Sequence, residues 1–238
     1  MPLQLTGSEN RMLDTRERIA AGLQLLHGGD VVEIRALKVG EFGSTMSGYF
    51  DDYSLAAEAA MWLEAEGAGG IYTLINKVHP GCLARSPNFL TQRAPKTTTE
   101  TDIIKVQWML VDLDPDRPSG ISATQDELNK AKKASRIVYE MAGDMFGYDR
   151  LIRACSGNGW HVLIPIDEDA DTKYNKSVLK LFQQELRYIE GITVDGSVTK
   201  KNQLTKLYGT KACKGWTTPD RPHRGSYILT PDLETYNV

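Results

Sequence analysis

The feature that most constrains this chain is a mostly apolar run, residues 106–115 (VQWMLVDLDP), which ends in two carboxylates one residue apart. Alternate side chains of a strand point to the same face, so we expect Asp112 and Asp114 to point together, roughly 7 Å apart at two strand rises. Two like charges at the end of a buried strand repel one another unless a cation lies between them. Pro115 cannot donate to a sheet ladder, so it is expected to end the strand where the carboxylates reach solvent.

Two interpretations of this run are open. Oxygen-rich clusters suit Mg²⁺ or Mn²⁺, and in that interpretation both aspartates are metal ligands. In the other interpretation, the strand runs into an Asp-Pro turn and both acids are solvated, because a single Asp-x-Asp pair is a weak motif. The choice between them depends on the rest of the chain.

The composition is that of an ordinary globular protein. The 238 residues suffice for one domain or two closely packed lobes, with 41% hydrophobic and 25% charged residues. No apolar run approaches the ~20 residues that cross a membrane, and residues 1–10 lack the layout of a signal peptide. Cys82, Cys155 and Cys213 form no C-x-x-C pair, so we expect no structural zinc and a reduced, cytoplasmic protein.

The charge distribution is more informative than the formal net charge of −3. Residues 196–225 carry seven basic residues against one acid, Asp220. Such local patches, rather than the global sum, meet polyanions. The seven are Lys200, Lys201, Lys206, Lys211, Lys214, Arg221 and Arg224. The alternative is a solvated basic loop.

The order of expected elements indicates an α+β fold of two lobes. The first half should contain a helix that ends at Gly28, a strand over 31–39, an Ala-rich helix that ends at Gly67 and a strand over 71–75. An aperiodic segment, 79–101, follows. From residue 102 onward the pattern predicts strand, helix, strand, strand, helix, strand, the split β-α-β layout of ferredoxin-like or RNA-recognition-type (RRM-like) sheets; Thr124 to Glu127 is a capping box for the first of these helices. We therefore place an N-terminal α/β lobe at 1–101 and an RRM-like lobe at 102–238.

A third carboxylate, Asp195, ends the short expected strand 192–195. In a ferredoxin-like sheet the strand that carries Asp112 can lie beside it, and three carboxylates could then hold two divalent ions about 4 Å apart. One ion would activate a 3′-hydroxyl, and the other would bridge a nucleoside triphosphate and its leaving pyrophosphate. By itself, Asp195 is equally compatible with a turn before Gly196.

A glycine-rich connection, residues 156–161 (SGNGWH), joins two expected strands of the same half. Glycines such as Gly159 permit close backbone approach, so N–H groups can face an anion. Ser156 and Asn158 add polar groups, and His161 lies on the strand just beyond. A hairpin turn with Asn-Gly and a structural histidine would explain the same residues without a ligand. The basic segment 200–215 begins five residues after Asp195, and lysines suit phosphates as point charges.

Taken together, these residues resemble the archaeo-eukaryotic primase superfamily, in particular the primase–polymerases of phages and plasmids. Asp112-Leu113-Asp114 is similar to the family's first motif, Ser156 to His161 to the second, and Val194-Asp195 to the third. The downstream pattern of this family matches Asn202, Lys206, Gly209-Thr210 and Lys214-Gly215. Relatives often carry Arg at the position of Lys206. The lysine keeps the positive charge of that arginine and loses its bidentate geometry.

The resemblance, which covers most of the chain, implies a primase fold with an N-terminal α/β lobe packed on an RRM-like catalytic lobe. It implies a metal-dependent DNA primase–polymerase that adds nucleotides from NTP or dNTP to a primer 3′-hydroxyl and can initiate strands de novo. The expected metal ligands and catalytic residues are Asp112, Asp114 and Asp195, with Mg²⁺ or Mn²⁺ in a two-metal site. The expected nucleotide contacts are Ser156, Asn158, Gly159, His161, Lys206, Thr210 and Lys211, and the expected nucleic-acid contacts are Lys214, Arg221 and Arg224.

The expected partners are a DNA template and primer, a nucleoside triphosphate and, in a longer protein, a helicase or helical primase segment, with no membrane. Two alternatives remain open: a metal-dependent nuclease and a non-catalytic nucleic-acid-binding module. A basic triphosphate pocket argues against the nuclease. An intact set of three carboxylates argues against the binding module, because such a set is a liability without metal.

Overall fold

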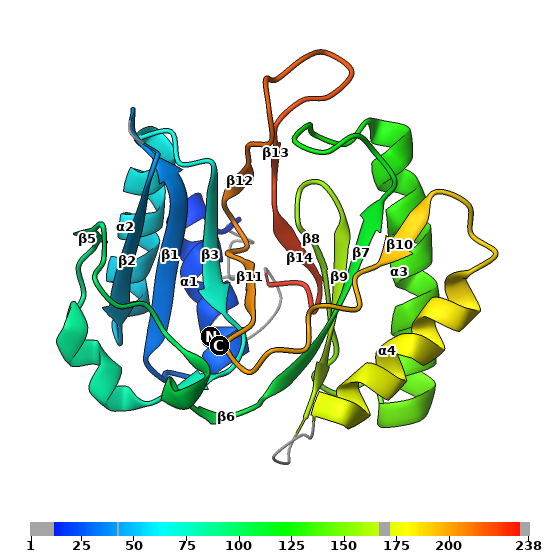
Figure 1. Cartoon of the computed structure of the whole chain (residues 1–238), viewed down its shortest axis with the longest axis horizontal. Helices are drawn as coiled ribbons and strands as arrows, with labels where there is room; N and C mark the ends of the chain where they lie inside the picture. The colour runs from blue at the N-terminus through cyan, green and yellow to red at the C-terminus, as the bar shows by residue number, and fades with distance from the viewer. Residues whose placement is uncertain (1–11, 42, 167–171, 234–238) are drawn as a thin grey trace, which may run out of the picture.

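The computed structural model describes residues 12–41, 43–166 and 172–233. Within them, two five-stranded sheets built from antiparallel pairs stand side by side, and α3 (Gln125–Phe146) and α4 (Thr172–Leu186) cover the outer face of the second sheet (Figure 1). This confirms the predicted α+β class. None of the described helices is both long and apolar enough to cross a membrane.

The first sheet has the strand order β11-β3-β1-β2-β5. Its strands are β1 (Val32–Val39), β2 (Ser44–Phe50), β3 (Gly70–Leu74), β5 (Thr91–Gln92) and β11 (Leu204–Lys206). Helices α1 (Thr15–His27) and α2 (Tyr53–Ala65) pack with it, and Ile19, Ile34 and Leu63 are completely buried in the core that they share. The helices begin where side chains cap them: Asp14 forms a capping box with Glu17.

The second sheet has the strand order β10-β7-β9-β8-β14. Its strands are β7 (Trp108–Pro115), β8 (Ile152–Cys155), β9 (Trp160–Pro165), β10 (Ile192–Val194) and β14 (Tyr227–Thr230). Helix α3 connects β7 to β8, and β9 lies between these two strands in the sheet. Helix α4 connects β9 to β10, and β7 lies between these two strands in the sheet. Two such interrupted β-α-β units define the ferredoxin-like layout, so that prediction is confirmed.

Apolar periodicity explains how α3 packs on this sheet. Its buried positions Leu128, Ala131, Ala134 and Val138 recur at three- and four-residue spacing, which places them on one face of the helix. The capping box starts this helix as predicted: the Glu127 amide donates to the Thr124 hydroxyl, and the Glu127 carboxylate accepts from the Thr124 amide. Both sheet and helix therefore follow from local pattern.

Short elements connect the two halves. Strands β4 (Lys77–Val78) and β6 (Ile103–Lys105) pair with each other, as do β12 (Lys211–Ala212) and β13 (Arg224–Gly225). The aperiodic segment 79–101 contains β5 and the 3₁₀ helix η1 (Pro80–Arg85), and a second 3₁₀ helix, η2 (Glu100–Asp102), overlaps its end. An Arg85–Asp102 ion pair of 2.6 Å joins the two ends of this connection.

The second half of the chain also contributes to the first sheet. Strand β11 pairs with β3, with Leu204 opposite Leu74 and Lys206 opposite Tyr72. In the other direction, α1 reaches the second core, where the Leu26 carbonyl accepts a 3.0 Å hydrogen bond from the Trp108 indole. Residues 204–206 therefore belong to the first sheet, although they lie in the second half of the predicted division at residue 102. The crossing places side chains near β11 opposite the carboxylates of β7.

Candidate active site

A cavity of about 130 Å³ lies where the end of β7 faces the first sheet, and both Asp112 and Asp114 line it. They lie two residues apart on β7, so they share a face as predicted from strand geometry. The other lining residues are Gly69, Gly70, Tyr72, Leu110, Ser156, Asn158, His161, Leu204, Thr205, Lys206, Ala212, Cys213 and Lys214. The cavity therefore brings the carboxylate pair, the 156–161 connection and the basic segment into one place.

His161 is held between the two sheets. The β7–β9 register places it opposite Asp112, and its Nε2 atom lies 3.4 Å from the Asp112 carboxylate. Its Nδ1 atom lies 2.8 Å from the Tyr208 hydroxyl and 3.3 Å from the Thr205 hydroxyl, both in or just after β11. With partners on both ring nitrogens, the buried imidazole has one fixed orientation, with Nε2 toward the carboxylate.

The two carboxylates differ in electrostatics. Burial by itself would raise the pKa of Asp112, but the charge and hydrogen bond of His161, together with the charges of Lys214 and Arg117, outweigh it and hold the pKa below its usual value. Burial and the negative charge of Asp112 raise the pKa of Asp114. The ionised pair is therefore internally repulsive, and a cation between the two carboxylates would relieve that repulsion.

Arg117 braces the turn that follows β7. Its guanidinium lies 3.4 Å from the Asp114 carboxylate and donates to the carbonyls of Pro115 (3.1 Å) and Ile121 (3.2 Å). The side chain is only 7% exposed. It therefore fixes the 116–121 turn against the strand end and partly offsets the charge of Asp114.

The 156–161 connection is a tight turn that presents a free donor. The Gly159 amide donates to the Ser156 hydroxyl at 3.0 Å, and a Cβ at Gly159 would come within 2.6 Å of the Asp114 carboxylate, so glycine is needed for this close approach. The Asn158 side-chain oxygen accepts from the Ala123 amide at 2.8 Å. Its Nδ2 atom is buried without a partner among the described residues, although Asn158 lines the cavity. An oxygen of a bound ligand would satisfy it.

Two lysines give the cavity a basic wall. Lys206 is only 6% exposed, donates to the Lys211 carbonyl at 2.6 Å and lies 5.8 Å from the Tyr72 ring centre. Burial lowers the pKa of Lys206 to about 8. Lys214 lines the same cavity, and its ammonium forms no hydrogen bond or ion pair within the described part of the chain. Both are placed to meet a polyanion.

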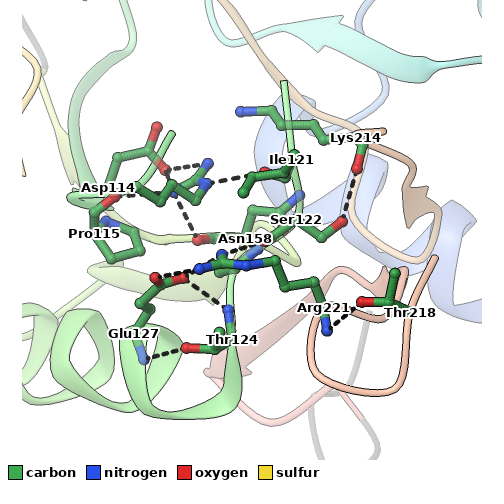
Figure 2. Close-up of polar contacts among 12 residues, drawn as sticks. Asp114, Pro115, Ile121, Ser122, Thr124, Glu127, Asn158, Lys214, Thr218 and Arg221 are labelled. Atoms are coloured by element: carbon green, nitrogen blue, oxygen red, sulfur yellow. Dashed lines mark hydrogen bonds and ion pairs between the residues drawn. The ribbon is translucent and has the colours of Figure 1, made fainter. Parts of the chain in front are cut away.

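Other predicted contacts do not line the cavity. The buried Thr210 hydroxyl donates to the Leu207 carbonyl at 2.6 Å, and the Lys211 amide donates to the Glu64 carboxylate. Arg221 makes a two-pronged ion pair with Glu127 at 2.8 and 2.9 Å (Figure 2), and Arg224 donates to the Ala123 carbonyl at 2.6 Å. In this structure these groups hold loops together.

Asp195 lies beside Asp112 on the other flank of β7. Its amide donates to the Asp112 carbonyl at 3.0 Å, which extends the β10–β7 pairing by one residue. Its carboxylate accepts from the Ser197 amide at 2.8 Å and does not line the cavity. The main chain of Asp195 thus lies beside Asp112, while its carboxylate caps the turn that follows.

The donor set fits a divalent cation of the Mg²⁺ type. Within residues 12–41, 43–166 and 172–233, no three His, Cys, Asp or Glu side chains form a group that could hold a metal ion by itself. Mg²⁺, however, is usually bound by one or two carboxylates plus phosphate oxygens and water. The repulsive Asp112–Asp114 pair offers two such carboxylates, and the Asn158 Nδ2 atom, a donor without a partner among the described residues, belongs to a residue that lines the same cavity.

Four residues that shape this cavity were not predicted from the sequence: Tyr72, Arg117, Thr205 and Tyr208. Arg117 lies three residues after Asp114, and that spacing was the available signal for it. The roles of Thr205 and Tyr208 depend on the crossing of β11 into the first sheet, which no local pattern announces.

No family model and no curated protein sequence matches the chain. Among solved structures, it is similar to primase RepB′ (TM-score 0.46, 13% identity, covering 90% of this chain and 56% of that chain). It is similar to the catalytic domain of RepB′ in complex with initiator DNA (0.46, 10%, 92% and 84%) and to the polymerase domain of Mycobacterium tuberculosis ligase D in complex with DNA (0.45, 16%, 88% and 80%). The chain spans a little over half the length of the first of these.

The Tyr208 contact can be tested by Tyr208→Phe, which removes the hydroxyl and keeps the ring. Because the buried His161 Nδ1 loses its nearest partner, we expect the free energy of unfolding to fall by about 1–2 kcal/mol in urea denaturation. Tyr188→Phe is the matched control, since Tyr188 is 80% exposed, and should change it by less than about 0.5 kcal/mol. Equal effects of the two substitutions would contradict the contact.

Proposed function

We propose that this chain is the catalytic core of a metal-dependent DNA primase–polymerase. It would transfer a nucleotide from NTP or dNTP to a 3′-hydroxyl on a DNA template, and it would start strands as well as extend them. One observation carries the proposal: a single cavity is lined by a repulsive carboxylate pair, by two lysines and by a buried amide that has no partner among the described residues. A complex of a cation with a triphosphate carries a positive charge that complements the carboxylates and negative charges that complement the lysines.

Asp112 and Asp114 would hold the divalent ions, either Mg²⁺ or Mn²⁺. Ions bound there supply the activation of the 3′-hydroxyl and the neutralisation of the leaving pyrophosphate. Asp195 would join the pair by exchanging its bond to the Ser197 amide for the ion, since its backbone already lies beside Asp112. His161, fixed by Tyr208, keeps the Asp112 carboxylate oriented.

The basic residues and the 156–161 connection would hold the triphosphate. Lys206 supplies positive charge, and Asn158 Nδ2 and the Ser156 hydroxyl supply neutral donors. Gly159 allows the turn to lie against Asp114, which would bring these donors near the ions. Thr210 and Lys211 would support Lys206, because Lys211 accepts from Lys206 and Thr210 fixes the preceding turn.

The partners in this proposal are a DNA template, a primer and a nucleoside triphosphate; in a longer protein a helicase or a helical primase segment would act with this core. Lys214 is the basic residue best placed to contact nucleic acid. Arg221 and Arg224 would act by shaping the loop that carries Lys214, since their guanidiniums are bound to Glu127 and the Ala123 carbonyl.

Primer extension tests the proposal. Wild-type protein with a labelled primer on a DNA template, dNTP and Mn²⁺ or Mg²⁺ should lengthen the primer. Asp112→Asn should reduce the rate at least about 100-fold, because it removes a charged ligand from the site. Asp116→Asn is the control: Asp116 is exposed, accepts from the Thr193 hydroxyl and lies two residues beyond the pair.

The same gel separates the alternatives. Extension that survives Asp112→Asn would contradict the proposed site. Shortening of the primer that depends on Asp112 would support a nuclease instead. A mobility shift with neither lengthening nor shortening would support a non-catalytic binding module.

The role of Lys206 predicts a pH dependence. Its pKa of about 8 in the folded protein means that the lysine is charged below pH 8 and loses its charge above it. The affinity for dNTP with Mg²⁺ should therefore be full at pH 7 and fall as pH rises through 8, by up to about tenfold at pH 9.5. Calorimetric titration at several pH values measures this. Lys206→Arg, which stays charged, should bind with a flat profile over the same range; a flat profile in the wild type would show that Lys206 does not contact the triphosphate.

A further inference from the structure

The connection between β12 and β13, residues 213–223, projects from the molecule above the two sheets (Figure 1). We refer to it as the 213–223 loop. Its first residues belong to the cavity system: Cys213 and Lys214 line the carboxylate cavity, and Gly215 lines a second hollow of about 500 Å³. The two hollows share Asp114, Tyr72 and Lys214, so the second one leads outward from the carboxylates to this loop.

Several hydrogen bonds and one ion pair hold the 213–223 loop in place. Arg221 clamps it to the start of α3, with one hydrogen bond to the Ser122 carbonyl at 2.8 Å in addition to the two-pronged Glu127 ion pair (Figure 2). Thr218 and Arg221 exchange backbone hydrogen bonds of 3.3 and 3.2 Å, and His223 Nε2 lies 2.8 Å from the Gly215 carbonyl. These contacts fix the loop tip relative to the hollow.

This fixed loop presents Trp216 to solvent. Trp216 is 92% exposed, the highest value among the exposed large hydrophobic side chains of the described residues. An indole has a large flat apolar surface that gains free energy when it is covered. The residues that follow it, Thr217 to Asp220, are polar or proline, so this part of the loop adds no large apolar side chain to the indole. A protein interface would offer an apolar core, whereas an isolated aromatic surface fits a single flat partner.

The surroundings of the second hollow indicate which flat partner. Its wall contains three basic residues, Lys38, Arg117 and Lys214, against one acid, Asp114, and it lies next to the loop that carries Trp216. Basic side chains that follow a backbone, together with an aromatic side chain on which a base stacks, are the two components of single-stranded nucleic-acid sites. The charge of this wall therefore complements a phosphate backbone, and the indole complements a base.

We propose, as an extension that rests on the proposed function, that Trp216 stacks on an unpaired base of the template strand at the entrance to the active site. Lys38 and Lys214 would contact the phosphates of the same strand. Trp216 would be a positioning residue: it holds the template strand in place and takes no part in the transfer step. Because Arg221 holds the 213–223 loop against the start of α3, a base stacked on Trp216 would have a fixed position relative to Asp114.

The test is equilibrium binding of a fluorescently labelled single-stranded oligo(dT) of about twelve nucleotides, measured by anisotropy without nucleotide or divalent cation. Trp216→Ala should weaken binding about 5- to 100-fold, the range for loss of one base–aromatic stack. Trp216→Phe, which keeps an aromatic face, should recover most of the affinity. Trp62→Ala is the matched control, because Trp62 is a half-exposed indole on α2 outside both hollows, and it should bind as the wild type does.

A second series uses oligonucleotides with one abasic position moved along the strand. In the wild type, one abasic position should weaken binding, and in Trp216→Ala that position should make no further difference. The proposal is overturned if Trp216→Ala binds within twofold of the wild type, if Trp62→Ala loses as much, or if the wild type does not bind the oligonucleotide. It is also overturned if Trp216→Ala changes only the oligomeric state in light scattering.

These results are independent of catalysis. A wild type that binds through Trp216 but extends no primer would refute nucleotidyl transfer alone. A wild type that extends primers while Trp216→Ala binds the oligonucleotide normally would refute the stacking role alone.

Discussion

The cavity depends on one pairing, that of β11 with β3. This three-residue strand comes from the second half of the chain and adds to the first sheet, so that Thr205, Lys206 and the following Tyr208 face the end of β7. Without it, the carboxylates on β7 would lie on one sheet and the basic wall would have no fixed position. The His161–Tyr208 contact then ties the two sheets together at the point where the charges meet. The site is therefore a property of the interlock between the lobes.

The same contact between the two sheets buries ionisable and polar groups that the folded protein alone does not fully neutralise or pair. Asp114 lies beside Asp112 with a raised pKa, Lys206 is buried with a lowered pKa, and Asn158 Nδ2 is buried without a partner among the described residues. Each of these costs folding free energy. Opposite unmet charges that line one cavity are consistent with a ligand that carries both a cation and a polyanion, which is the basis of the proposed function.

Local pattern was sufficient to predict much of the fold. The apolar run that ends at Pro115, the Thr124–Glu127 capping box and the helical periodicity of α3 each depend on residues within a few positions of one another. From these the order of elements, and hence the ferredoxin-like layout of the second sheet, followed. The proximity of Asp112, Asp114 and His161 also follows from strand register once that layout is known.

Long-range partners could not be predicted in the same way. Strand β11 has three residues and a partner more than a hundred positions earlier in the chain, so its sheet could not be assigned from pattern. Arg221 looks like a free basic residue in the sequence, yet it is bound by Glu127, 94 positions away. The Asp195 carboxylate likewise caps a turn whose geometry depends on where β10 ends. These contacts depend on tertiary structure, so local sequence pattern does not predict them.

The central claim, that the carboxylate pair and the basic wall together hold a cation and a triphosphate, is tested most directly by diffraction. Anomalous scattering from a crystal soaked with Mn²⁺ and a dNTP would locate both. The account predicts a manganese ion bound by Asp112 and Asp114, with triphosphate oxygens in contact with Lys206 and Asn158. Manganese bound elsewhere, or a nucleotide outside this cavity, would contradict it.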